Sequence, residues 1–207
     1  LLGAVRTVTH DRVDSGTYLV FDDEVHAARD VVKSHTSALS TFRSPERGPV
    51  GEFTPKGLRL FREPRSYAAA AASVDEVAAE IPLFTSGLGV DGDTLRRVVD
   101  LTDGPAVDGV VVAGTGLGNT TGAVCGAIAA VREAGVPVVI ASRCHEGATA
   151  PLYGGDGGGT TLDEFGVLWA GDLPAWKARI KLAVALAVGD GGVDEAFFER
   201  GLREPER

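Results

Sequence analysis

Apolar residues in the second half of the chain gather in short continuous runs separated by stretches with helical spacing. Residues 81–85, 109–113, 136–141 and 165–170 form four runs with the length and composition of buried strands. Between the runs, apolar positions recur three or four residues apart, as along one face of a helix. This alternation predicts an α/β fold with a parallel sheet and flanking helices, because each connection between strands passes through a helix.

Capping residues predict where the intervening helices begin and end. Asp91 or Asp93 begins a helix that ends near Leu101, and the polar residues 119–121 begin another that ends at Gly135.

The last predicted helix starts at Asp172 and Pro174 and stops at Gly189. Its apolar face is expected to consist of Trp176, Ile180, Ala183, Val184 and Ala187. Ligands of such sheets collect beyond the carboxyl ends of the strands. The loops expected at that edge are residues 86–91, 114–119, 142–149 and 171–173.

The first third of the chain has a different pattern. Residues 17–21 resemble a strand, and residues 53–61 around Gly57 predict a hairpin. Residues 22–36 combine helical spacing with β-branched residues, so their pattern is compatible with a helix or with strands. An alanine run with scattered charge marks residues 62–81 as a linker. We therefore expect three parts, namely residues 1–61, the linker 62–81 and an α/β domain at 82–207.

Composition and charge exclude several classes of protein. The 207 residues include 20 Lys plus Arg and 29 Asp plus Glu, which gives a net charge of −9 and disfavours nucleic acid as a partner. No apolar run reaches the ~18 residues that a membrane span needs, so we expect no membrane association. Two cysteines and no basic-then-apolar leader give no sign of export, so the cytoplasm is the expected compartment. The chain lacks Met and begins at Leu1, which leads us to expect a piece of a longer polypeptide.

A glycine-rich loop, residues 114–119, leaves one predicted strand and enters a predicted helix. Its backbone amides and the positive end of the helix could hold a phosphate or a carboxylate. The spacing of Gly116, Gly118 and Gly122 is not that of a dinucleotide fingerprint. Arg143 follows the next strand, however, so a phosphate site stays a possible interpretation of the loop. The alternative is that the glycines only allow a tight turn.

Lys33 is the candidate catalytic residue of the first third. On an extended strand Lys33 and His35 share one face. A lysine in a partly dry site has a pKa below its usual value of about 10.4, so it can help to activate a hydroxyl nucleophile. The alternative is an ordinary surface lysine.

Two other segments are candidates for a function. Adjacent Cys144, His145 and Glu146 cannot easily converge on one metal ion and do not make a catalytic Cys-His pair, so we expect no metal site there. Cys125 is expected to be a small core residue. The glycine tract of residues 153–159 predicts a loop of unusual freedom, either a lid or a surface insertion.

Taken together and in order, several segments resemble the L-asparaginase family, which are bacterial homotetrameric amidohydrolases. They are Phe21-Asp22-Asp23-Glu24, residues 28–36, Phe42-Arg43-Ser44-Pro45, Gly48-Pro49-Val50-Gly51, residues 109–119, Ser142-Arg143 with Gly147-Ala148-Thr149, and Gly171-Asp172-Leu173 with Lys177-Ala178-Arg179.

The resemblance implies roles for particular residues. Residues 1–61 would be the tail of a larger amino-terminal domain, and residues 82–207 the carboxyl-terminal α/β domain. Lys33 would be the catalytic lysine that supports a threonine nucleophile in a Thr-Lys-Asp arrangement. Asn119 would be lent by one subunit to the substrate held in its neighbour, and Tyr153 would belong to a loop that reaches the neighbour's site.

The chain also departs from the family pattern. The Thr-Gly-Gly-Thr nucleophile motif and the His-Gly-Thr-Asp-Thr motif of the family are both absent, so the chain alone is not expected to hydrolyse asparagine. Val32 stands where the family commonly has threonine, and Asp22 where it has asparagine.

The resemblance implies a fragment of an amidohydrolase that, when complete, hydrolyses L-asparagine to L-aspartate and ammonia through a threonine acyl-enzyme. It implies no metal or organic cofactor, and a homo-oligomer, which in the family is a tetramer of dimers. The other readings are a nucleotide- or phosphate-binding α/β module and an interaction domain without catalytic activity.

Overall fold

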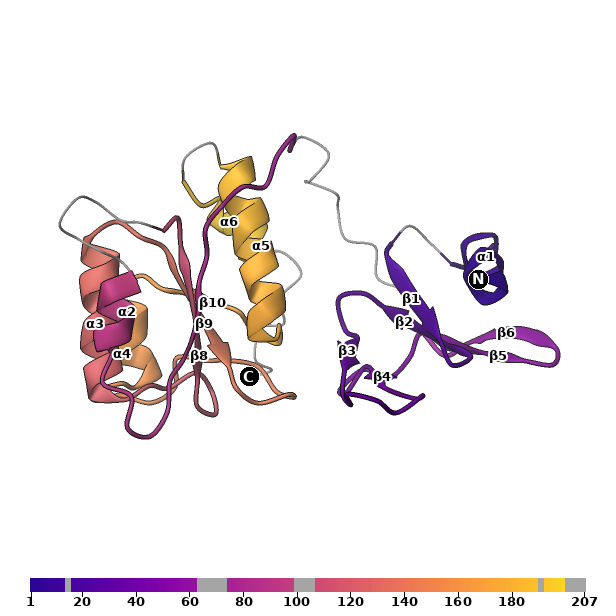
Figure 1. Ribbon diagram of the computed structural model, residues 1–207, viewed down its shortest axis with the longest axis horizontal. Coiled ribbons are helices and arrows are strands. Elements are labelled where there is room, and N and C mark those ends of the chain that lie inside the picture. The colour runs from indigo at the N-terminus through magenta and orange to yellow at the C-terminus, as the bar shows by residue number, and fades with distance from the viewer. Residues whose placement is uncertain (14–15, 63–73, 99–106, 190–191, 200–207) are drawn as a thin grey trace. The chain divides into compact units, whose positions relative to one another are not determined.

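The computed structural model describes residues 1–13, 16–62, 74–98, 107–189 and 192–199. The chain divides into two compact units, Leu1–Ala68 and Ala69–Arg207, each of which is described by itself (Figure 1). Of the segment expected to be a linker, Arg62 pairs with Asp30 in the first unit, whereas Ile81 is buried in the core of the second. None of the helices in the described ranges is long and apolar enough to cross a bilayer.

The first unit is built around a four-stranded antiparallel sheet. Its elements are α1 (Leu2–Val8), β1 (Tyr18–Phe21), β2 (Glu24–Ala27), β5 (Gly51–Thr54) and β6 (Gly57–Leu60), and the strands lie in the order β1-β2-β5-β6. Asp22 and Asp23, with φ of 49° and 60°, make the two-residue turn between β1 and β2, where short polar side chains tolerate left-handed backbone. The predicted hairpin around Gly57 is confirmed as β5 and β6, whose strands close at the Thr54–Gly57 pair.

A separate two-stranded sheet completes the first unit. Strands β3 (Val32–Lys33) and β4 (Phe42–Arg43) pair antiparallel, with Val32 opposite Arg43 and Lys33 opposite Phe42. The segment compatible with either a helix or strands therefore forms strands, first β2 and then β3.

The second unit confirms the predicted α/β fold with a parallel sheet and flanking helices. Its strands are β7 (Leu83–Thr85), β8 (Val110–Gly114), β9 (Val138–Ser142) and β10 (Leu168–Trp169), and its helices are α2 (Asp93–Val98), α3 (Gly122–Glu133), α4 (Gly159–Glu164), α5 (Ala175–Val188) and α6 (Glu195–Glu199). The four strands lie in the order β10-β9-β8-β7, all neighbours parallel.

Helices cover both faces of this sheet, α2, α3 and α4 on one face and α5 and α6 on the other (Figure 1). Alternate residues of each central strand point to opposite faces, so Val110 and Val112 pack toward α3 while Val111 and Ala113 pack toward α5. Burial on both faces explains why these strands read as continuous apolar runs.

The predicted caps of α3 are confirmed in part. Thr121 is its N-cap, with Oγ1 accepting a hydrogen bond of 3.3 Å from the Val124 amide, and Gly135 follows the helix with φ of 81°. The predicted end of the preceding helix near Leu101 lies outside the described residues. Helices α1, α4 and α6 were not predicted from the sequence pattern.

The predicted apolar face of the last helix is confirmed at Ala183 but wrong at Trp176 and Ile180. Trp176 and Ile180 of α5 are 49% and 59% exposed. The helix packs through a face of mostly small residues instead, which are Ala175, Ala178, Leu182, Ala183 and Ala185. Small side chains let the helix lie close to the sheet, so the periodicity of the larger residues did not indicate the buried face.

Candidate functional site

Lys33 lies on the short β3–β4 hairpin of the first unit. Its side chain is exposed, and its Nζ lies 5.8 Å from the ring centroid of Phe42 on the opposite strand. Beyond the two paired residues, the Ser34 amide and hydroxyl donate to the Thr41 carbonyl at 2.7 and 3.0 Å. In this chain the amine is therefore attached to an ordered hairpin but is open to solvent rather than in a dry pocket.

His35 does not share a strand face with Lys33, contrary to the expectation for an extended segment. Strand β3 ends at Lys33, and His35 Nδ1 accepts hydrogen bonds of 3.0 Å from the amides of Ser37 and Ala38. Its backbone amide donates to the hydroxyl of the buried Thr41. His35 thus closes the turn between β3 and β4.

A buried histidine, His26, lies beside this hairpin. Its Nδ1 is 3.0 Å from Ser44 Oγ, and Ser44 follows β4. Its Nε2 is 3.2 Å from Glu24 Oε2 but is not aligned for a hydrogen bond. Burial lowers the pKa of His26, and the negative charge of Glu24 opposes that change. The sequence pattern did not single out His26, because its partner Ser44 lies on a turn 18 residues away.

Asn119 ends the glycine-rich loop at the carboxyl edge of the second unit's sheet. Its Oδ1 accepts a hydrogen bond of 3.1 Å from the amide of Gly159, the first residue of α4. The backbones of Thr115 and Asn119 bond to each other at 2.7 and 3.0 Å, which closes the loop on itself. These bonds fix the side chain of Asn119 between the loop and α4.

The glycine-rich loop has few amides left for an anion. The amides of Thr115, Gly118 and Asn119 donate within the loop, and the Thr120 amide donates to the Gly157 carbonyl at 2.8 Å. Arg143 Nη1 donates to the Ser86 carbonyl at 3.1 Å. This geometry disfavours the phosphate reading, because a phosphate cradle needs amides that point outward.

Tyr153 begins the glycine tract at the same edge, with its side chain 57% exposed. The Tyr153 carbonyl accepts hydrogen bonds from the Thr160 amide and hydroxyl at 3.0 and 3.1 Å. The Thr161 hydroxyl bonds the Gly155 carbonyl at 2.9 Å. The tract is therefore joined to α4 by hydrogen bonds at both of these carbonyls.

Cys144, His145 and Glu146 are all exposed in the loop after β9. Across the described residues, no three His, Cys, Asp or Glu side chains are grouped as a metal site would require. Cys125 is buried in α3, as expected, and burial raises the pKa of its thiol.

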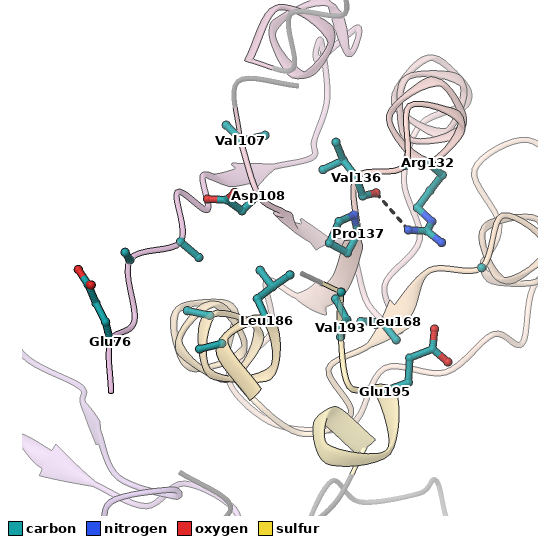
Figure 2. Close-up of a pocket in the computed structure, with 17 residues that line it drawn as sticks. Glu76, Val107, Asp108, Arg132, Val136, Pro137, Leu168, Leu186, Val193 and Glu195 are labelled. Carbon is teal, nitrogen blue, oxygen red and sulfur yellow. Dashed lines mark hydrogen bonds between the residues drawn. The ribbon is translucent and has the colours of Figure 1, made fainter. Parts of the chain in front are cut away.

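A cavity of about 620 Å³ lies at the opposite edge of this sheet, where the strands begin (Figure 2). Its walls include Pro137, Leu186 and Val193, and its polar side chains include Arg132 and Asp108. Arg132 Nε and Nη1 donate to the carbonyls of Phe165 and Val136, each at 3.1 Å, and Asp108 accepts from the Glu80 amide. Because these two groups already hold the backbone, the cavity is a weaker candidate site than the carboxyl edge.

The residues named from the sequence thus fall into two groups. Asn119, Tyr153 and Arg143 lie in loops at the carboxyl edge of the second unit, and Lys33 lies on the hairpin of the first. Sequence reasoning missed the acidic Asp30 as a structural centre, because two of its three arginine partners, Arg29, Arg47 and Arg62, are far from it along the chain.

Known protein families and relatives match the chain over both units. The family model described as "Asparaginase, N-terminal" matches residues 1–66, and "Glutaminase/Asparaginase C-terminal domain" matches residues 80–195.

The curated relatives carry two kinds of name. A "Probable L-asparaginase" of Deinococcus radiodurans is 32% identical over 190 residues, which cover 90% of this chain and 56% of the relative. "L-asparaginase 2" of Escherichia coli is 29% identical, covering 83% and 48%. A glutamyl-tRNA(Gln) amidotransferase subunit of Haloquadratum walsbyi is 30% identical, covering 79% and 36%.

The chain spans about half the length of the L-asparaginases it matches and a smaller share of the amidotransferase subunits. The model named for the N-terminal domain matches the first part of the chain, and the model named for the C-terminal domain matches the later part. On these matches, and on the α/β architecture of its second unit, the chain belongs to the asparaginase family.

Proposed function

We propose that this chain supplies the carboxyl-terminal part of an amidohydrolase that hydrolyses L-asparagine to L-aspartate and ammonia. The observation that carries the proposal is the match of both asparaginase domain models, in order, along one chain. Relatives named L-asparaginase in Deinococcus radiodurans, Bacillus licheniformis and Escherichia coli support this choice of substrate.

In the proposed reaction, a threonine hydroxyl from a part of the polypeptide outside this chain attacks the side-chain amide carbon of asparagine. The hydroxyl proton passes to the departing nitrogen, which leaves as ammonia. Water then hydrolyses the acyl ester, which releases aspartate and restores the hydroxyl. Lys33 assists the first proton transfer, and the reaction uses no metal or organic cofactor.

Asn119 and Tyr153 hold the amino-acid end of the substrate in this proposal. Since Asn119 Oδ1 accepts from the Gly159 amide, its Nδ2 is the group that remains to donate to the substrate carboxylate. Tyr153 is an exposed residue in a loop at the same edge. Both residues serve the site of a neighbouring subunit, so the active form is a homo-oligomer, a homotetramer in our proposal.

The exposure of Lys33 leads us to propose that this chain alone is inactive. An exposed lysine lacks the enclosed surroundings in which an amine can exchange a proton with a nucleophile away from water. The segment that carries the nucleophile would cover the Lys33 face of the β3–β4 hairpin in the complete enzyme.

The test is a fusion in which the amino-terminal portion of the Deinococcus radiodurans relative precedes residues 1–207. We expect the fusion to release ammonia from L-asparagine and the 207-residue chain to release none. Lys33→Met in the fusion should lower kcat by roughly 10²- to 10⁴-fold. Lys56→Met, which removes an exposed lysine at the β5–β6 turn, is the matched control and should leave kcat unchanged. Full turnover by a folded Lys33→Met fusion would exclude the role of Lys33.

A second candidate function is that of a subunit of a glutamyl-tRNA(Gln) amidotransferase, because several relatives carry that name. Assaying the fusion with L-glutamine beside L-asparagine separates an asparaginase from an enzyme that prefers glutamine.

The nucleotide-binding hypothesis and the non-catalytic hypothesis predict other results. Thermal stabilisation by a nucleotide but not by aspartate would favour the former, and a fusion that folds without hydrolysing either amide would favour the latter.

The compartment of the complete protein is also a proposal. We place it in the cytoplasm, although a relative from Haemophilus influenzae is named "Probable L-asparaginase periplasmic". Fractionation of the native host with an antibody against this chain decides between the two.

A further inference from the structure

The hairpin that carries Lys33 has little backbone support of its own. Strands β3 and β4 share two residue pairs and form a sheet separate from the four-stranded sheet of the first unit. A two-stranded pair of this length is marginally stable in water. Its place against the rest of the unit therefore depends on side-chain contacts.

Among the described residues, Asp30 contacts three arginine side chains from different segments of the first unit. Its carboxylate, 7% exposed, lies 2.8 Å from Arg62 Nη2 and 3.5 Å from both Arg29 Nη1 and Arg47 Nε. Arg62 follows β6, and its Nη2 also donates to the Gly48 carbonyl at 3.3 Å. One carboxylate thus joins the start of β3, the loop after β4 and the end of the four-stranded sheet.

Burial makes these ion pairs stronger than pairs at the surface. The side chains of Arg29, Arg47 and Arg62 are 16%, 11% and 26% exposed, so water and salt screen them only in part. Neutralising Asp30 would remove the charge that faces Arg62, whose buried Nε has no hydrogen-bond partner among the described residues.

We infer that Asp30 is a positioning residue for Lys33, because its buried carboxylate fixes the segment that leads directly into β3. The inference rests on the proposed function, in which Lys33 assists proton transfer. The backbone amides of Asp30 and Val31 both bond the Ala27 carbonyl, so the chain between the carboxylate and Lys33 has little slack. A displacement of about 1 Å at a reacting group costs about 100-fold in rate.

The first test reads the surroundings of Lys33 in the 207-residue chain itself. The chain has four lysines, at positions 33, 56, 177 and 181, so ¹³C-methylated lysine gives few NMR signals, and Lys33→Arg assigns the one of interest. The ring of Phe42, 5.8 Å from Lys33 Nζ, makes that signal sensitive to small movements of the hairpin.

We expect Asp30→Asn to shift or broaden the Lys33 signal and to leave the other three in place. Glu52→Gln is the matched control, because it removes a more exposed ion pair of the same unit, with Arg59 at 2.7 Å. An unchanged Lys33 signal in a folded Asp30→Asn chain would overturn the inference.

A second variant decides the matter if Asp30→Asn does not fold. Arg62→Lys keeps the positive charge but loses the rigid guanidinium whose Nη2 donates to both Asp30 and the Gly48 carbonyl. The same displacement of the Lys33 signal is expected from this milder change. A folded Arg62→Lys chain with the wild-type Lys33 signal would count against Asp30 as a positioning residue.

Kinetics in the fusion separate this inference from the proposed function. Asp30→Asn should lower kcat by about 100-fold with little change in KM, since the substrate contacts lie elsewhere. A wild-type fusion that releases no ammonia would refute the proposed function, and activity retained by Lys33→Met would refute the role of Lys33 in it. Loss of activity in Lys33→Met together with wild-type kcat in Asp30→Asn would refute the positioning role alone.

Discussion

Two histidines of the first unit have opposite surroundings. His35 is exposed and accepts two backbone amides, whereas His26 is 1% exposed between Ser44 and Glu24. Burial lowers the pKa of His26, Glu24 acts in the opposite direction, and the positive charge of Arg62 lowers it further. The folded protein therefore holds His26 as a neutral imidazole more firmly than the unfolded chain does.

This difference predicts a pH dependence of stability. The unfolded chain takes up a proton at His26 near pH 6.5, and the folded protein resists until a lower pH. The contribution of His26 to the free energy of unfolding of the first unit should therefore be fully present above pH 6.5. It should decrease as the pH falls from 6.5 toward the lower pKa of the folded protein. Urea unfolding at several pH values between 5 and 8 measures the slope of the free energy of unfolding against pH.

His26→Gln should flatten that slope, because glutamine keeps hydrogen-bonding groups but does not titrate. His145→Gln, an exposed histidine in the second unit, is the control and should leave the slope as it is. An identical slope in the wild-type chain and the His26→Gln chain would show that another group sets the pH dependence.

Among the elements, α5 shows how a helix can bury its smaller residues. Its rotation is held by the guanidinium of Arg179, whose Nε donates to the Ile81 carbonyl at 2.6 Å. With that rotation, Leu182 points into the core and is fully buried, while Ile180 is 59% exposed. The two residues are aliphatic and two positions apart, so they make a matched pair.

We expect Leu182→Ala to lower the free energy of unfolding of the second unit by about 2–5 kcal/mol, through lost burial and the cavity left behind. Ile180→Ala should change it by less than about 0.5 kcal/mol, because the side chain is largely in water. Chemical denaturation followed by tryptophan fluorescence measures both. Equal losses would mean that Ile180 is covered in solution.

At the scale of the whole molecule, the buried apolar core is concentrated in the second unit. The two clusters that cover its sheet contain most of the buried hydrophobic residues. In the described part of the first unit, only Val25 and Val50 are buried hydrophobics, and Leu2, Val5 and Val8 of α1 are each more than half exposed. The first unit therefore presents an open apolar surface.

This contrast predicts different behaviour of the two units in the 207-residue chain. The first unit should bind the dye ANS and should be cut first by a protease, while residues 82–207 persist as a folded fragment. Mass spectrometry of the fragments over time shows the order of cleavage. The double variant Val5→Ser, Val8→Ser should reduce ANS fluorescence. Early cleavage within the second unit would contradict the prediction.

The sequence by itself determined the architecture of the second unit. Its central strands are buried on both faces, so residues such as Val110, Val111 and Val112 are all apolar and their run is visible without a structure. Local chemistry also placed the Gly57 hairpin and the Thr121 cap, because each depends on residues close in the chain. The roles of Asn119 and Tyr153 came from the family resemblance, which also specified the role that the sequence pattern had suggested for Lys33, and all three stay predictions.

Only the tertiary structure decided the features that depend on residues far apart in the chain. The pairing of β2 with β5, which places Val25 opposite Gly51, made a strand of part of a segment that was compatible with a helix. The packing of α5 against the sheet left Trp176 in solvent, and folding brought Arg62 to Asp30 across 32 positions. Local periodicity carries no information about such contacts, because burial and charge pairing arise only when distant segments meet.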